Sequence, residues 1–246
     1  MTVRQKKILK RAVVITLAVI LAVAAAFFIY TADYYHADSM ANTALISDPG
    51  VTVGNLDGNI VFTPAGGASA GLIFYPGGKV EYTAYAPLMH SIARNGIQCV
   101  LVKMPFNLAV LDMNAANGIA DSFPEVQEWY IGGHSLGGTM AASYAAGHAD
   151  ELSGVVLLAS YSTADLSQSG LKVLSMYGSR DGVLNMDSYA KYRGCLPEDS
   201  TEIVINGGNH AGFGSYGAQS GDGTADVSSE EQTETAAAAV TEFILP

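Results

Sequence analysis

The chain has 246 residues and a formal net charge of −11, and only 14% of its residues are charged, against about 25% in a typical soluble protein. Hydrophobic residues make up 49%, so the composition excludes a disordered chain and a coiled coil. The length suits one large globular domain or two small ones.

The first predicted element is an apolar segment, Ala12 to Tyr30, in which Thr16 is the only polar residue before the terminal tyrosine. As a helix it would extend roughly 28 Å, close to the hydrocarbon thickness of a bilayer. The preceding residues 1–11 form a basic tail, which the positive-inside tendency places in the cytoplasm. We therefore expect a single-pass cell-membrane protein with an extracytoplasmic domain. A cleaved signal peptide is the alternative, and it would make the protein secreted.

The part of the chain beyond this segment is strongly acidic. Seven basic residues stand against twenty-three acidic ones after Tyr30, a formal charge of −16. Such a surface repels phosphate backbones and lacks clusters of lysine and arginine, so we expect no nucleic-acid partner.

The chain has two cysteines, Cys99 and Cys195. They could form one disulfide in an oxidising space or remain as two thiols. Cys99 lies within the apolar run Ile97 to Val102, which favours a buried thiol. Neither cysteine has the spacing of a metal site.

A polar connector with a mobile character is expected over residues 31–50, followed by a single domain over residues 51–246. Short β-branched runs alternate there with longer helical patterns, which predicts an α/β fold with a mostly parallel sheet flanked by helices. The predicted helices are Tyr82–Arg94, Leu136–Ala146 and Ser229–Phe243. The predicted strands are Asn59–Thr63, Gly71–Tyr75, Gln98–Lys103, Trp129–Gly132, Gly154–Ala159, Lys172–Tyr177 and Glu202–Ile205.

A glycine-rich and then acidic stretch over residues 212–235 interrupts the alternation. We interpret it as a solvated loop that leads into the last helix, because anionic side chains favour a helix N-terminus. Calcium binding would need a loop of oxygen ligands, which residues 222–226 resemble only faintly.

The strongest local motif is Gly133-His134-Ser135-Leu136-Gly137, between a predicted strand and an alanine-rich predicted helix. A serine on such a tight turn needs a glycine two positions away on either side, because a side chain there would strike the neighbouring strand or helix. The turn exposes the hydroxyl at the sheet edge. The N–H of Leu136, at the helix N-terminus, can then stabilise negative charge on an attacked carbonyl oxygen.

Serine needs a base to act as a nucleophile, and the base needs a group that orients it. Of the five histidines, His134 is directly beside the serine and points differently along the turn. His210 is the exception, because it lies in a loop at the carboxyl end of the last predicted strand, where open parallel sheets build their sites. Asp181 occupies the equivalent place after the preceding strand and could fix the tautomer of His210. Asp165, which follows an earlier strand, is the reserve candidate for the acid.

The chain order Ser135, Asp181, His210 resembles that of the α/β-hydrolase family, and Gly133 to Gly137 is similar to the family's nucleophile elbow. More narrowly, Tyr75-Pro76-Gly77-Gly78-Lys79-Val80 and Asn209-His210-Ala211-Gly212-Phe213-Gly214 are similar to short, membrane-anchored bacterial hydrolases related to dienelactone hydrolases. Two positions depart from these patterns. Pro76 stands where the family often has a histidine, and Ser135 stands where dienelactone hydrolases generally have a cysteine.

The resemblance also implies a role for the turn Pro76-Gly77-Gly78, which follows a predicted strand. In such a fold this turn would lie beside the elbow and offer a backbone N–H to the oxyanion. Gly78 is the first candidate for that donor, and Lys79 is the second. A phosphate-binding loop is not expected here, because the serine or threonine and the upstream glycine of that motif are missing.

Together these features predict a serine hydrolase that cleaves small esters, lactones or thioesters through an acyl-enzyme, without metal or organic cofactor. Only residues 160–170 are available for a lid, which predicts a small, open site. An acyltransferase or peptidase with the same triad, and a non-catalytic anchored binding protein, remain as alternatives.

Overall fold

A computed structural model of the chain describes residues 2–245, which form two units that we describe separately: residues up to Tyr34 and those from Tyr35 onward. The first unit is one helix, α1 (Val3–Ala32). It is longer than the predicted segment because the basic tail continues it to a capping box at Thr2. Among the described residues, α1 is the one helix long and apolar enough to cross a membrane, and a signal sequence would share these properties.

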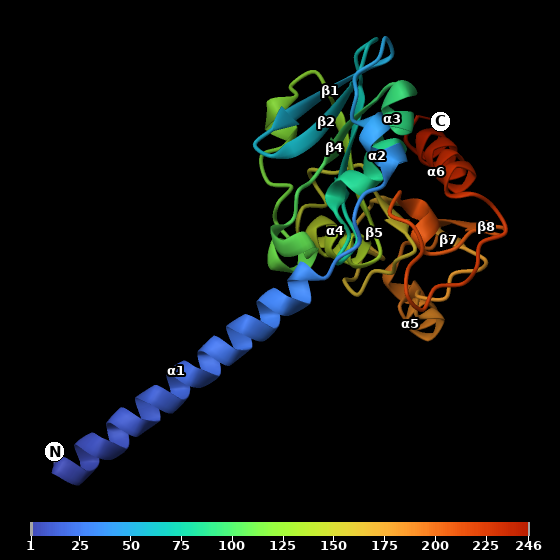
Figure 1. Ribbon diagram of the computed structural model, residues 1–246. Helices are drawn as coiled ribbons and strands as arrows, with labels where there is room; N and C mark the ends of the chain where they lie inside the picture. Colours follow the sequence, from blue (N-terminus) through green and yellow to red (C-terminus); the bar gives the residue numbers. More distant parts are fainter. Residues whose placement is uncertain (1, 246) are drawn as a thin grey trace. The chain divides into compact units, whose positions relative to one another are not determined.

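The second unit is built on an eight-stranded sheet with the order β1-β2-β4-β3-β5-β6-β7-β8 (Figure 1). Strand β2 pairs antiparallel with both β1 and β4, and all the other pairs are parallel. The strands are β1 (Val51–Leu56), β2 (Asn59–Pro64), β3 (Ala70–Tyr75), β4 (Ile97–Leu101), β5 (Glu128–His134), β6 (Gly154–Leu158), β7 (Lys172–Gly178) and β8 (Thr201–Ile205).

Helices cover both faces of this sheet. Helices α3 (Ala86–Arg94) and α6 (Ser229–Ile244) pack side by side on one face (Figure 1). Helix α4 (Leu136–Gly147) packs on the other face, where its buried alanines form a second core with Ile131. Five strands are buried along their whole length or nearly so, as expected of parallel strands covered on both sides. The α/β prediction is therefore confirmed, and every predicted strand is present.

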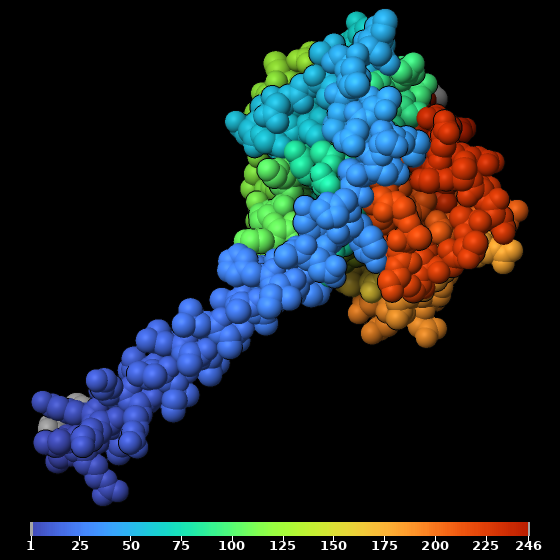
Figure 2. All heavy atoms as spheres, in the orientation of Figure 1, coloured from blue at the N-terminus to red at the C-terminus, as the bar shows by residue number. Residues whose placement is uncertain are grey.

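Much of the expected connector is folded with the second unit. The second unit begins at Tyr35, which forms a parallel bridge with Val80. Helix α2 (Ser39–Ala44) follows, with Ala41 fully buried against the domain. Figure 2 shows this segment in blue across the domain surface, beside the C-terminal residues in red. The N–H of Asp38 donates to the carbonyl of Ser215 (2.9 Å). The polar residue Asp38 caps α2, which accounts for part of the polar character of this segment.

The remaining differences concern short elements. Strand β1 was not predicted because its run of β-branched residues is broken by Gly54 and Asn55. The short helix α5 (Met186–Lys191) was also not predicted. No helix or strand interrupts residues 160–170, so the structure has no inserted lid there.

Candidate active site

The elbow motif joins β5 to α4 in a strained conformation. Ser135 has φ 52° and ψ −123°, a region that non-glycine residues rarely occupy and that occurs at functional turns. Its N–H donates to the carbonyl of Leu158 (2.9 Å), and its own carbonyl accepts from the hydroxyl of Ser160 (2.8 Å). The neighbouring strand thus holds the strained turn, and the half-buried Ser135 lies at the carboxyl end of β5.

Glycines on both sides of Ser135 allow the close approach of the backbone. A Cβ atom on Gly133 would lie 2.5 Å from the carbonyl carbon of Gly137. A Cβ atom on Gly137 would overlap the carbonyl oxygens of Tyr75 and Pro76. Because these contacts are to backbone atoms, they cannot be relieved by a change of rotamer.

Gly137→Ala is therefore expected to separate α4 from the end of β3 and to reduce ester hydrolysis at least about 100-fold, by misplacing the groups around Ser135. Gly147→Ala is the matched control, because Gly147 ends the same helix and the added methyl group would meet no atom within 4 Å outside the nearby backbone of that helix. Hydrolysis rates and thermal unfolding of both variants provide the check. Equal activity in the two variants would contradict this interpretation of the elbow.

Two of the predicted site residues are joined by a buried hydrogen bond. Nδ1 of His210 lies 2.9 Å from Oδ2 of Asp181, and both side chains are at most 2% exposed. Oδ1 of Asp181 accepts from the N–H groups of Val183 (2.9 Å) and Leu184 (2.8 Å). These bonds fix the carboxylate, which in turn orients the imidazole. Asp181 follows β7 and His210 follows β8, as the sequence predicted.

The other nitrogen of His210 is not engaged. Within residues 2–245, Nε2 of His210 is buried and has no hydrogen-bond partner, and no hydrogen bond joins it to Ser135. The ring of His210 instead lies 4.5 Å from the ring of His134, centroid to centroid. His134 directly precedes Ser135, so the imidazole of His210 lies beside the elbow.

His134 was not among the predicted site residues, yet it links three parts of the site. Its Nδ1 lies 2.7 Å from the hydroxyl of Tyr85, which also accepts from the N–H of Gly77 (3.1 Å). Burial raises the pKa of Tyr85, so its hydroxyl keeps its proton beside Nδ1 of His134. Burial, followed by repulsion from His210, lowers the pKa of His134 well below its usual value, so this imidazole stays neutral. No local sequence signal could reveal a partner forty-nine positions away.

The two candidate oxyanion donors in the turn after β3 differ in the hydrogen bonds of their N–H groups. The N–H of Lys79 donates to the carbonyl of Asn107 (2.8 Å), so it is already engaged. The N–H of Gly78 makes no hydrogen bond within residues 2–245. A Cβ atom on Gly78 would lie 2.9 Å from the side chain of Leu136, so the two residues are neighbours. Leu136 is the first residue of α4, where an N–H has no acceptor within the helix.

The reserve candidate for the acid is not placed near the base. Asp165 is exposed, and its carboxylate accepts from the N–H of Ser167 (3.0 Å). Hydrogen bonding to Ser167 lowers the pKa of Asp165. The acid beside His210 is Asp181.

The described part of the chain contains no group of three or more histidine, cysteine, aspartate or glutamate residues arranged to hold a metal ion. In the stretch 222–226, the carboxylate of Asp222 accepts hydrogen bonds from backbone N–H groups instead.

Cys99 and Cys195 are both free thiols, and burial raises the pKa of Cys99.

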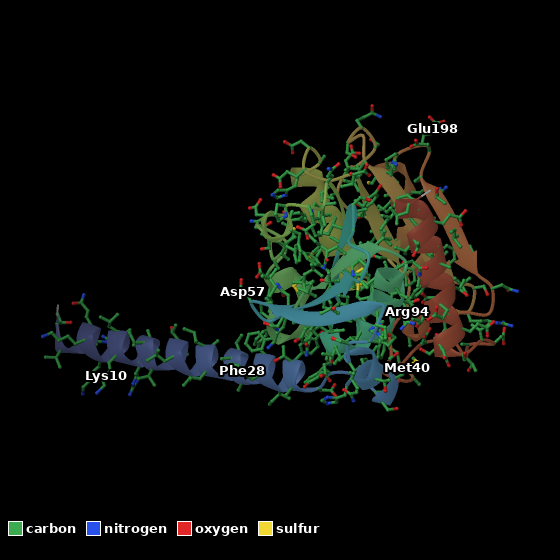
Figure 3. All side chains as sticks on the ribbon, turned by 90° about the horizontal axis from the view of Figure 1, so that it is seen from above. Lys10, Phe28, Met40, Asp57, Arg94 and Glu198 are labelled. Carbon is green, nitrogen blue, oxygen red and sulfur yellow. The ribbon has the colours of Figure 1, made fainter. Side chains whose placement is uncertain are left out.

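One groove of the domain has a volume of about 780 Å³ and is formed by residues of α2, α3 and α6. Met40 and Arg94, both labelled in Figure 3, line it. Ser135, Asp181 and His210 do not. The candidate active site is therefore separate from this groove.

Comparison with known proteins identifies the family of the chain. Residues 71–234, more than half of the chain, match the sequence model of the "Alpha/beta hydrolase family". This match includes Ser135, Asp181 and His210. No curated protein sequence matches the chain.

Solved structures share the fold at low sequence identity. TT1662 from Thermus thermophilus is 14% identical with a TM-score of 0.59, over 80% of this chain and 99% of its own. Est1E from Butyrivibrio proteoclasticus is 14% identical with a TM-score of 0.54, over 79% and 98% of the two chains. The apo form of Thermogutta terrifontis esterase 2 has the same identity and TM-score, over 82% and 98%.

Proposed function

The chain belongs to the alpha/beta hydrolase family of enzymes, and on this premise we propose that it is a serine hydrolase that cleaves small carboxylic esters, lactones or thioesters. The observation that carries the proposal is the buried Asp181–His210 hydrogen bond of 2.9 Å beside the elbow that presents Ser135. An orienting acid, a base with one unengaged nitrogen and a hydroxyl on a strained turn are the parts that acyl transfer requires.

In the proposed first step, Nε2 of His210 takes the proton of Ser135 as Oγ attacks the carbonyl carbon of the substrate. The N–H groups of Leu136 and Gly78 stabilise the oxyanion. Together they lower the activation free energy by several kcal/mol. The tetrahedral intermediate then collapses, and His210 gives its proton to the leaving alkoxide or thiolate. Asp181 stabilises the imidazolium that exists between these two proton transfers.

In the second step, His210 takes a proton from water, which attacks the acyl-serine. Collapse of this second intermediate releases the carboxylic acid and returns the proton to Ser135. The mechanism requires a hydrogen bond between Oγ of Ser135 and Nε2 of His210, which forms as substrate binds. Such bonds are often long or absent in an unliganded enzyme.

We further propose that α1 anchors the protein in the cell membrane, with the hydrolase domain on the extracytoplasmic side. The length and apolar composition of α1 and the basic residues before Ala12 support this topology. If the helix is removed as a signal sequence, the domain is secreted.

The family fold and the site geometry do not distinguish water from another acyl acceptor, so an acyltransferase or a peptidase remains an alternative. A non-catalytic binding protein is disfavoured because all three side chains of the proposed triad are present and two of them are already paired.

The test is a substrate panel. We expect the full-length protein in detergent to hydrolyse p-nitrophenyl esters, and to cleave short acyl chains better than long ones because residues 160–170 form no lid. The matching anilides, whose leaving group is poorer, should react more slowly. Folded protein without activity on any ester would contradict the proposal, and faster transfer to an added alcohol than to water would favour the acyltransferase.

A further inference from the structure

We infer that Asp222 is a positioning residue, whose carboxylate ties the loop of Asp181 to the loop of His210 and so sets the geometry of this pair. The inference rests on the proposed function, because it assigns a role relative to the proposed base. The solvated loop predicted from the acidic stretch does not describe Asp222, which is half-buried and engaged with both loops.

The hydrogen bonds of Asp222 reach both sides of the Asp–His pair. Oδ1 accepts from the N–H of Gly182 (3.0 Å), the residue directly after Asp181, and from the N–H of His210 itself (3.2 Å). Oδ2 accepts from the N–H of Ala211 (2.8 Å). Hydrogen bonds to an ionised acceptor are stronger than those between neutral groups. One carboxylate therefore fixes the backbone on each side of the Asp181–His210 bond.

The backbone around Asp222 is packed closely enough to define where the carboxylate lies. A Cβ atom on Gly182 would lie 2.7 Å from the carbonyl oxygen of Gly221 and 2.8 Å from the N–H nitrogen of Gly223. The side-chain amide of Asn209 donates to the carbonyl of Gly223 (2.8 Å). The segment that carries Asp222 is thus held against both loops at once.

The loop of His210 is also attached to α6. Gln232 on α6 is almost fully buried; its amide nitrogen donates to the carbonyl of Asn209 (2.7 Å) and its amide oxygen accepts the N–H of Asn209 (2.9 Å). Gln232 fixes the residue before His210, and Asp222 fixes His210 and the residue after it. Without Asp222, His210 would keep its hydrogen bond to Asp181, but each of the two loops would lose hydrogen bonds that fix its backbone.

A second acid in the same stretch provides a matched control. Asp226 pairs with Arg180 through Nε (2.8 Å), and both side chains are more than half exposed. Such exposed ion pairs contribute little to stability. Asp226→Ala changes the charge of the stretch as Asp222→Ala does, without removing an acceptor from His210.

The experiment compares the wild type with Asp222→Ala, Asp222→Asn and Asp226→Ala in the full-length protein. We expect kcat for a short ester to fall about 10- to 100-fold in Asp222→Ala, with KM within about twofold, because the base is misplaced while the acyl site is intact. Asp222→Asn, which keeps one oxygen acceptor at the same position, should recover part of this loss. Asp226→Ala should match the wild type.

A second readout does not depend on activity. The imidazole proton shared between His210 and Asp181 should give a downfield proton resonance in the wild type, in Asp226→Ala and, at a shifted position, in Asp222→Asn. If Asp222→Ala fails to fold, the kcat of Asp222→Asn and the position of its resonance test the inference instead. Wild-type kcat and an unshifted resonance in Asp222→Asn would overturn the inference. Absence of activity in the wild type would refute the proposed function instead, and the resonance would still test Asp222.

Discussion

Ser135→Ala is expected to lower kcat/KM for ester hydrolysis at least about 10⁴-fold, because the variant has no atom that can form the acyl-enzyme. Initial rates with a short p-nitrophenyl ester measure this loss directly. The fold should survive, since the hydrogen bonds that hold residue 135 run through its N–H and its carbonyl. A residual rate above that of water is expected from the oxyanion donors and substrate binding.

Ser143→Ala is the matched control for this substitution. Ser143 lies on α4, two turns beyond the elbow, and its hydroxyl donates to the carbonyl of Thr139 (2.9 Å). Its replacement should leave hydrolysis unchanged. If Ser135→Ala retained wild-type activity, the nucleophile would lie elsewhere in the chain.

Replacement of the base should have an effect of similar size. Within residues 2–245, His210 is the only histidine whose imidazole is bonded to a buried carboxylate, and we expect His210→Ala to lower kcat about 10⁴- to 10⁶-fold. Asp181→Asn should cost about 10⁴-fold, because an amide cannot hold the required tautomer or stabilise the imidazolium. The double variant should be little worse than His210→Ala, since the two side chains act as one unit.

His148→Ala is the matched control, because it removes a histidine that has no role in the proposed mechanism. His148 is the C-cap of α4, and its Nδ1 is bonded to the carbonyl of Tyr144 (2.9 Å). Rates for His148→Ala should equal those of the wild type. Near wild-type turnover by His210→Ala would show that another group accepts the serine proton.

The sheet could be predicted because buried parallel strands give short apolar runs that are visible in the sequence. Strand β1 could not, because it is an edge strand with Gly54 and Asn55 in its middle and is stabilised by pairing with β2. The same limit applies to Tyr35, which pairs with Val80 through backbone atoms and leaves no pattern of side chains.

In the candidate site, too, some residues could be predicted from the sequence and others could not. Ser135, Asp181 and His210 could be proposed because each follows a strand, and parallel strands bring their carboxyl ends to one edge. Spacing alone could not distinguish Gly78 from Lys79 as the oxyanion donor. In the structure their N–H groups differ, because that of Lys79 donates to the carbonyl of Asn107. His134 and Asp222 act through tertiary hydrogen bonds, so only the folded chain reveals their places.

The central claim is that Ser135 is the nucleophile activated by His210, and covalent labelling tests it most directly. A fluorophosphonate should modify the folded full-length protein once, on the peptide that contains Ser135, as shown by mass spectrometry. Labelling should be absent in Ser135→Ala and slowed by orders of magnitude in His210→Ala. An adduct on a different residue, or no adduct on correctly folded wild-type protein, would contradict the account.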